Sequence, residues 1–195
     1  MKISYAIECR PMSGQDGYSG DAARVIEDAC NDAVLFIVVD ALGHGREAQK
    51  VAIKSLDYCQ QNASSPLIDI LEGLHKHMRG SSGLVATVCR VHKKERWLRY
   101  SSIGDTAIMQ LTPKPVHGLS RPGVIGYQMY PPIEHCWSLN DNTVIAIFSD
   151  GITLPSVDQF DDAMQNGVSS LSRYVVSNFS KPDDDALCLI LKVAS

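Results

Sequence analysis

The stretch VLFIVVDALGHGREA, residues 34–48, decides the fold of this chain. Its first six residues form a continuous apolar run rich in β-branched side chains, which is typical of a strand buried on both faces. Asp40 closes the run, and ALGHG follows as a turn. From Arg46 to Gln61 apolar residues recur at steps of three and four, which predicts an amphipathic helix. This stretch therefore predicts a buried strand that ends in a carboxylate and leads through a turn into a helix.

The flanking sequence supplies further elements of both kinds. Residues 1–10 alternate weakly and predict an edge strand, whereas residues 11–32 are rich in Gly, Ser and Asp and predict mainly loop, with a short helix near Val25. Pro66 opens a second helix, in whose first turn its missing N–H costs little. Downstream the patterns predict strands at 83–91, 96–104, 105–111, 143–150 and 186–193, a long irregular loop at 112–137, and a helix late in 151–180.

The order of these elements indicates the fold class. The strands at 83–91, 96–104 and 105–111 follow one another closely, so we expect a continuing meander. A meander needs no helical crossover, which parallel pairing would require. The sequence therefore predicts an α+β fold with mainly antiparallel sheets rather than a doubly wound parallel sheet. The 195 residues suit one domain spanning residues 1–195, and no repeat or clear linker interrupts them.

Composition narrows the function classes. The formal net charge is -4, and the short basic cluster Lys93, Lys94, Arg96 and Arg99 is interrupted by Glu95, so nucleic-acid binding has little electrostatic support. No apolar stretch reaches the ~18 residues of a membrane span, and the N-terminus has no apolar core of a signal peptide. The six cysteines form no C-x-x-C pair, which argues against a zinc ribbon or redox motif. We expect a cytoplasmic protein without a membrane partner.

Acidic residues recur at the ends of the predicted buried strands. Asp40 ends VLFIVVD, Asp150 ends TVIAIFSD, and the run 183–185 directly precedes ALCLILKV. Taken singly, an aspartate at a strand end is more often a turn or cap residue. Several carboxylates brought together would repel one another unless a cation offset their charge, and hard oxygen ligands suit magnesium or manganese. The joint pattern predicts a divalent-metal site.

Six motifs occur in an order that resembles a known family. They are SGDAA, VVDALGHGREA, GLVATVCRV, SIGDTAIM, FSDGIT and DDDALCLIL, running from residue 19 to residue 191. This set resembles the metal-dependent serine/threonine phosphatases of the PPM (phosphatase 2C-like) family, in the SpoIIE-type branch, and most of all the compact stand-alone phosphatases of stressosome pathways. The resemblance implies a four-layer α-β-β-α sandwich of two mainly antiparallel sheets flanked by helices.

The resemblance also implies a ligand set for two Mn²⁺ or Mg²⁺ ions. The metal ligands would be the carboxylates of Asp21, Asp40, Asp150 and Asp183 and the backbone carbonyl of Ala41, with Asp40 bridging both ions. Asp40 and Asp150 would carry the catalytic role. Asp184 replaces Asp183 as the ligand if the register of the last motif slips by one residue. Two positions depart from the family, since Ala41 stands where glycine is usual and Ala186 where threonine is usual.

The implied function is a phosphatase acting on phosphoserine or phosphothreonine of a regulatory protein, by analogy one with a STAS domain. A non-catalytic binding module on the same fold is the alternative, although such a module would not need all four carboxylates. His44 could donate a proton to a leaving alkoxide, but a turn residue is the simpler interpretation. Thr87 matches a family position near the sheet core. A monomer is expected, and the loop 112–137 is the expected partner contact.

Overall fold

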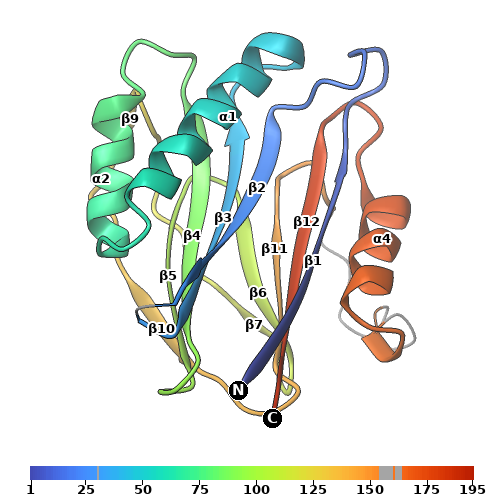
Figure 1. Ribbon diagram of the computed structural model, residues 1–195. Coiled ribbons are helices and arrows are strands. Elements are labelled where there is room, and N and C mark those ends of the chain that lie inside the picture. Colours follow the sequence, from blue (N-terminus) through green and yellow to red (C-terminus); the bar gives the residue numbers. More distant parts are fainter. Residues whose placement is uncertain (30, 154–159, 161–163) are drawn as a thin grey trace.

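The computed structural model of the chain describes residues 1–29, 31–153, 160 and 164–195. Two antiparallel five-stranded sheets lie face to face, with helices α1 and α2 against one sheet and α4 against the other (Figure 1). The predicted α+β class and the four-layer α-β-β-α sandwich are therefore confirmed. Of the helices in the described ranges, none is long and apolar enough to cross a membrane.

The first sheet, here called sheet B, contains β3, the strand formed by the buried run 34–39. Its central strands β3 and β4 are buried almost throughout, because one face meets helices and the other meets the second sheet. The order is β10-β5-β4-β3-β2, and every pairing is antiparallel. The strands are β2 (Asp21–Asp28), β3 (Ala33–Ala41), β4 (Leu84–His92), β5 (Trp97–Ile103) and β10 (His135–Ser138).

The second sheet, sheet A, is built around the C-terminal strand. Strand β12 pairs with β1 on one side and β11 on the other, which confirms that the N-terminal segment is an edge strand. The order is β1-β12-β11-β6-β7, comprising β1 (Lys2–Arg10), β6 (Ala107–Thr112), β7 (Val116–His117), β11 (Val144–Phe148) and β12 (Ala186–Ala194). The predicted irregular loop contains β7 and a small hairpin of β8 (Gly123–Val124) and β9 (Gln128–Met129), and it runs into β10.

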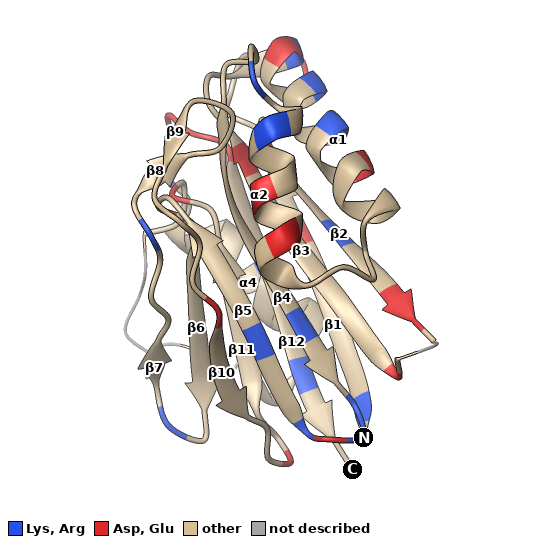
Figure 2. Cartoon of the chain, turned by 90° about the vertical axis from the view of Figure 1, so that its left-hand side faces the viewer, with Lys and Arg blue, Asp and Glu red and all other residues tan. Residues whose placement is uncertain are grey.

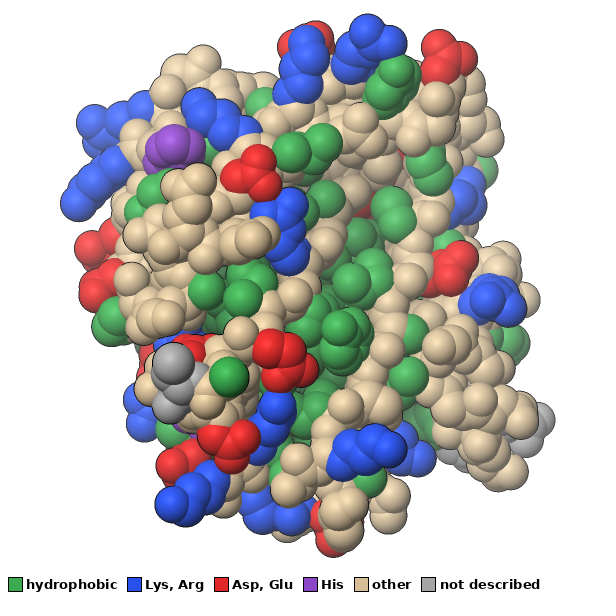
Figure 3. All heavy atoms as spheres, viewed as in Figure 1, with side chains coloured by type: hydrophobic (Ala, Val, Ile, Leu, Met, Phe, Trp, Pro, Cys, Tyr) green, Lys and Arg blue, Asp and Glu red, His purple; other side chains and the backbone are tan. Residues whose placement is uncertain are grey.

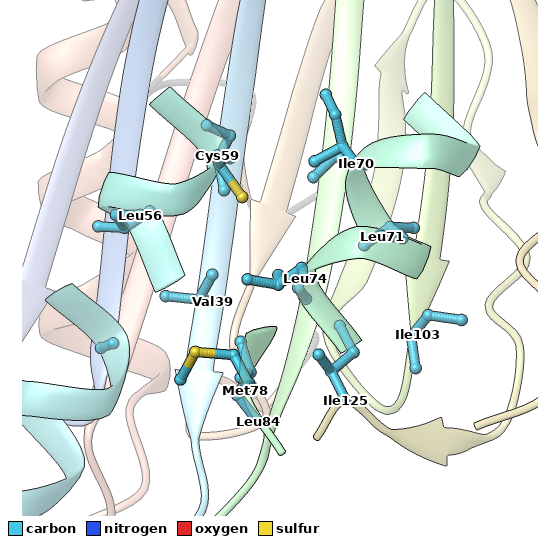
Figure 4. Packing of buried hydrophobic residues seen from close by; sticks show 14 of the residues in the cluster. Val39, Leu56, Cys59, Ile70, Leu71, Leu74, Met78, Leu84, Ile103 and Ile125 are labelled. Carbon is cyan, nitrogen blue, oxygen red and sulfur yellow. The ribbon is translucent and has the colours of Figure 1, made fainter. Parts of the chain in front are cut away.

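The helices bury the apolar stripes that their sequences predict. They are α1 (Gly45–Gln61), α2 (Leu67–His77), for which Pro66 is the N-cap, and α4 (Val168–Phe179). Leu56 of α1 and Leu74 of α2 pack toward Val39 and Leu84 of sheet B (Figure 4). Helix α4 packs on sheet A through residues that include Leu171 and Val175. Burying each such side chain contributes roughly 1.5–3 kcal/mol.

The sandwich is open along one side, where the edge strands β1 and β2 face each other without a covering helix. Tyr5 and Ile7 of β1 are 44% and 38% exposed although they point toward the other sheet. Tyr5 meets the buried ring of Phe36 edge-on, with ring centroids 5.7 Å apart. Hydrophobic side chains accordingly gather in the middle of this face (Figure 3). This open side lies next to the strand ends that carry the acidic residues.

Two sequence predictions are wrong. The first is the loop with a short helix near Val25, because residues 21–28 form strand β2. The segment DAARVIED is polar enough for a loop, but it pairs with β3 along its whole length, from Asp21 opposite Asp40 to Asp28 opposite Ala33. Pairing with a buried neighbour overrides weak intrinsic propensity. Cys30, at the end of the predicted loop, lies outside the described residues.

The second error concerns the meander, which does not continue. Strand β5 belongs to sheet B and β6 to sheet A, so the chain changes sheets at Gly104 and Asp105. Gly104 has φ +90°, and a Cβ there would lie 2.1 Å from Val85 Cγ1, so only glycine fits this crossing. The buried hydroxyls of Ser102 and Thr106 bond Thr87 Oγ1 at 2.7 and 2.8 Å and hold the two sheets together beneath it.

Candidate metal centre

The first two predicted ligands lie directly opposite each other. Asp21 begins β2 and Asp40 lies near the end of β3, and the antiparallel register pairs the two residues. Asp21 is only 4% exposed, and its Oδ2 has no hydrogen-bond partner among the residues that the structure describes. A buried carboxylate oxygen without a partner is costly. The fold thus brings two carboxylates together and leaves one of their oxygens unsatisfied.

The surroundings of this pair favour the protonated form of both carboxyls when no cation is bound. Burial, followed by the charges of Asp21 and Asp150, raises the pKa of Asp40 from 3.8 to about 9. Burial also raises the pKa of Asp21 from 3.8 to about 7, with Asp185 and Asp150 adding to the rise and a hydrogen bond with Ser149 opposing it. Such shifts arise where like charges share a poorly solvated site. A divalent cation would reverse them.

Asp150 reaches the same centre from sheet A. It lies two residues beyond the end of β11, in the turn that Gly151 completes. A Cβ on Gly151 would lie 1.7 Å from the carbonyl oxygen of Asp185, so only glycine lets this turn pass so close to the start of β12. The preceding Ser149 accepts a hydrogen bond from the Leu187 N–H at 2.9 Å and bonds the Asp21 carboxylate. Ser149 therefore links the two sheets at the centre.

Of the three consecutive aspartates, Asp184 is the one whose charge acts on both Asp21 and Asp40, although Asp185 acts more strongly on Asp21. Burial and then the charge of Asp150 raise the pKa of Asp184, and its own charge contributes to the raised pKa of both Asp21 and Asp40. Asp183 is not among the principal charges acting on Asp21, Asp40 or Asp184. These charges favour the alternative register, in which Asp184 takes the place given to Asp183, and the choice between the two ligands stays a prediction.

Asp185 has a different task, which sequence reasoning missed. Its carboxylate is 6% exposed and accepts two backbone hydrogen bonds of 2.7 Å, from Met12 N–H to Oδ1 and from Gly20 N–H to Oδ2. These bonds fasten the connection between β1 and β2 to the start of β12. Because Gly20 precedes Asp21 and Asp185 follows Asp184, one side chain fixes the backbone beside two candidate ligands.

Ala41 and Asp105 complete the surroundings. Ala41 is buried, its N–H donates to the Gly20 carbonyl at 3.1 Å, and its own carbonyl lies 2.9 Å from the place a Cβ on residue 20 would occupy. Glycine at position 20 is therefore needed to leave room for that carbonyl. Asp105, in the crossing between β5 and β6, adds its charge to those that raise the pKa of Asp40.

The donor set suits a hard divalent cation. It comprises carboxylates and a backbone carbonyl, with one buried oxygen lacking a partner and mutually raised pKa values. Among the residues that the structure describes, no three His, Cys, Asp or Glu side chains are arranged as a finished metal-coordination shell. The centre is thus a collection of carboxylates within electrostatic range of one another, which a cation would have to draw closer.

The two remaining candidates differ in their environment. His44 is the N-cap of α1, is exposed, and makes no side-chain capping hydrogen bond. Thr87 is fully buried, and its hydroxyl is satisfied within the group formed with Ser102 and Thr106. Its hydroxyl therefore serves the sheet-to-sheet crossing.

Comparison with known proteins places this geometry in context. No family model and no curated protein sequence matches the chain. Solved structures do match. One, from the bacterial stressosome, described as a modular system adapted to control secondary messenger signalling, has a TM-score of 0.89 and 24% identity, covering 98% of this chain and all of the other. RsbX in complex with magnesium has a TM-score of 0.84 and 18% identity, covering 98% and 96%.

A third structure contains the PP2C phosphatase domain and a fragment of the regulatory domain of SpoIIE from Bacillus subtilis. Its TM-score is 0.78 at 13% identity, covering 99% of this chain and 64% of the other. At such identities the similarity establishes the fold alone. The chain has the fold of PP2C-type phosphatases, and what it does must be argued from its own residues.

Proposed function

We propose that this protein is a metal-dependent phosphatase that removes phosphate from phosphoserine or phosphothreonine of a regulatory protein, with the whole of residues 1–195 as its phosphatase domain. The observation that carries the proposal is the cross-strand pair of Asp21 and Asp40, with a buried oxygen on Asp21 that lacks a partner. Asp150 and Asp184 add charge to the same centre from the other sheet. A purely structural role would not explain so much repulsion in one place.

The proposed ligands are the carboxylates of Asp21, Asp40, Asp150 and Asp184 and the carbonyl of Ala41. Two Mn²⁺ or Mg²⁺ ions bound there would lower the pKa of a water molecule and offset the charge of the phosphoryl oxygens. Asp40 and Asp150 are the catalytic residues in the sense that they would hold these ions beside the phosphate.

The rest of the chain positions these groups. Asp40 is held by the buried strand β3, and Ser149 orients the Asp21 carboxylate by a hydrogen bond. Asp185 fixes the backbone next to Asp21 and Asp184 through its bonds to Met12 and Gly20. Rigid placement of the carboxylates matters because the reaction depends on holding charged groups in a set geometry.

The structural neighbours support a particular class of substrate. One belongs to the bacterial stressosome, and another is RsbX, whose crystals contain magnesium. An RsbX-like role would make the substrate a phosphorylated regulatory protein of a stress pathway, of the STAS-domain type by analogy. We also propose that the protein acts in the cytoplasm as a monomer, which light scattering after gel filtration would test.

Hydrolysis of para-nitrophenyl phosphate, with Mn²⁺, with Mg²⁺ and with EDTA, tests the central claim. We expect metal-dependent turnover that falls at least 100-fold in Asp40→Asn. Asp69→Asn, an exposed carboxylate in the first turn of α2, is the matched control and should keep full activity. Turnover that is absent under every metal condition in a folded protein would instead favour a non-catalytic binding module on the same fold.

A further inference from the structure

A separate cavity lies at the far end of sheet B. It has a volume of about 410 Å³ and is formed where the turn before β3, the start of α2 and strands β4 and β5 meet. In Figure 2, blue bands of Lys and Arg on β4 and β5 lie below the end of α2 that the chain enters from α1. The lining includes Arg90, His92, Trp97, Arg99 and Glu134.

Two arginines face each other across neighbouring strands in this cavity. The register pairs Arg90 of β4 with Arg99 of β5, and two residues along it pairs His92 with Trp97. Like charges directly opposite each other in an antiparallel pair are destabilising. Because side chains two apart share a face of the sheet, all four lie on one face. The fold therefore keeps an unfavourable charge pair beside an aromatic ring.

Their existing partners satisfy the arginines in part. Arg99 Nη1 bonds Glu134 at 3.0 Å, and Glu134 is the one carboxylate among the described lining residues. Arg90 Nη2 donates to the carbonyls of Ala63 and Ser65, at 2.5 and 2.8 Å, while its Nε is buried without a partner. Burial lowers the pKa of Arg90. Among the bonds between described residues, Arg90 donates to carbonyls rather than to a carboxylate, although the charges of Asp28 and Glu134 act on it.

The aromatic ring beside the arginines is held rigidly. His92 stacks on Trp97 with ring centroids 3.7 Å apart, and the Arg99 guanidinium lies 4.3 Å from the centroid of the same ring. Burial lowers the pKa of His92, so this imidazole adds no positive charge at neutral pH, and Glu95 and Asp28 lie near enough to act on it. The positive charge of the lining therefore comes from the two arginines.

We propose that this cavity binds a small molecule through its phosphate group, at a site distinct from the acidic centre. A tetrahedral anion with several acceptor oxygens matches two guanidinium groups that point into one space, and it would remove their repulsion. The volume exceeds what one phosphate needs and falls in the range of small-ligand sites, so the ligand carries an organic part.

Its distance from the acidic centre follows from the sheet register. Arg90 lies opposite Leu35, five residues along β3 from Asp40, which is roughly 17 Å at about 3.4 Å per residue. A ligand here would not touch the proposed metal ligands. It would act on the connection between α1 and α2, whose carbonyls Arg90 already binds.

Fluorescence of Trp97 tests the proposal directly. The chain has two tryptophans, so Trp137→Phe leaves Trp97 as the reporter. The protein would be titrated in EDTA with inorganic phosphate, O-phosphoserine and adenosine monophosphate, because EDTA removes the metal through which the acidic centre would bind these anions. We expect a saturable signal with Kd below about 10 mM, tighter for one of the organic phosphates than for inorganic phosphate. A tenfold affinity difference corresponds to about 1.4 kcal/mol.

Variants decide where the ligand binds. Arg99→Gln and Arg90→Gln should each raise Kd at least tenfold, whereas Arg173→Gln, an exposed arginine on α4, should leave it unchanged. Arg90 also holds the segment before α2, so if its variant loses structure by circular dichroism, the exposed Arg99 decides alone. The proposal is overturned if the signal does not saturate by about 20 mM ligand, which is roughly twice the highest Kd expected. It is also overturned if both arginine variants fold and bind the ligand with the same Kd as the parent protein.

Discussion

Neutralising Asp40 should make the metal-free protein more stable while abolishing its activity. Burial and neighbouring carboxylates raise the pKa of Asp40 from 3.8 to about 9 in the folded state. The folded protein therefore binds this proton more tightly than the unfolded chain, so stability falls as pH rises from about 4 toward 9. At pH 7 the folded state keeps the carboxyl protonated, at a cost of about 4 kcal/mol at most. Asparagine avoids that cost at nearly constant size.

The size of the effect is set by coupling within the centre. The pKa of Asp21 is also raised, to about 7, and the charge of Asp21 contributes to the raised pKa of Asp40, so the two costs do not add in full. We therefore expect Asp40→Asn to raise the free energy of unfolding at pH 7 by about 2–4 kcal/mol, and by less at pH 5.

Urea unfolding followed by circular dichroism, in EDTA between pH 5 and 8, measures this difference. Asp69→Asn is the control, because its side chain is exposed and its charge is not among those that raise the pKa of Asp21 or Asp40. Adding Mn²⁺ should offset most of this difference, since a ligand at 100 times its Kd stabilises the wild type by about 2.7 kcal/mol. The reasoning fails if Asp40→Asn is no more stable than wild type at pH 7, or if the wild type gains stability from pH 5 to pH 8 without metal.

Three further outcomes follow from the same geometry. Asp184→Asn should reduce Mn²⁺-dependent hydrolysis of para-nitrophenyl phosphate at least 100-fold (about 2.7 kcal/mol). Asp183→Asn should change the same rate less than threefold (about 0.7 kcal/mol). If Asp183→Asn has the larger effect, Asp183 is the ligand, as expected from the sequence. Asp185→Asn should weaken activation by Mn²⁺ about 10- to 100-fold with the fold kept, as loss of groups that orient metal ligands does, and an unchanged Mn²⁺ titration would show that its two backbone bonds do not position the ligands. Gly151→Ala should lower the free energy of unfolding by more than about 2 kcal/mol, because the new Cβ would overlap the Asp185 carbonyl. Thermal unfolding measures this loss. Gly14→Ala is the comparison, because a Cβ there would meet no atom within 4 Å while φ is +84°, so it reports backbone strain without overlap.

The sequence predicted most strands and helices because their patterns are local. The buried run 34–39 and the stripes of α1, α2 and α4 each carry their own periodicity, and the structure shows them within a few residues of the expected bounds. Strand β2 could not be found this way, since its side chains are mostly half-buried and its structure comes from pairing with β3. The change of sheet at Gly104 depends on contact with Val85, which lies 19 residues earlier and leaves no local pattern.

The candidate site also contains residues that local sequence patterns reveal and residues that only long-range contacts reveal. Asp40 and Asp150 end or closely follow buried strands, so their sequence context alone singles them out. Asp183, Asp184 and Asp185 cannot be told apart by type or spacing, and only packing separates the residue that faces the centre from the one that accepts bonds from Met12 and Gly20. Arg90 and Arg99 were seen as parts of a strand and of a basic cluster, and only register shows that they are opposite each other.

The acidic centre joins the two sheets at the end of the sandwich next to its open side. Asp21 and Asp40 come from sheet B, whereas Asp150 and Asp184 come from sheet A, at the end next to the open side between β1 and β2. Without a cation, ionising these carboxyls would set like charges against each other across the two sheets, whereas the bonds made by Ser149 and Asp185 hold the sheets together. A bound divalent ion would turn the repulsion into attraction across the same gap. Metal binding should therefore order the catalytic carboxylates and stabilise the packing of the two sheets at the same time.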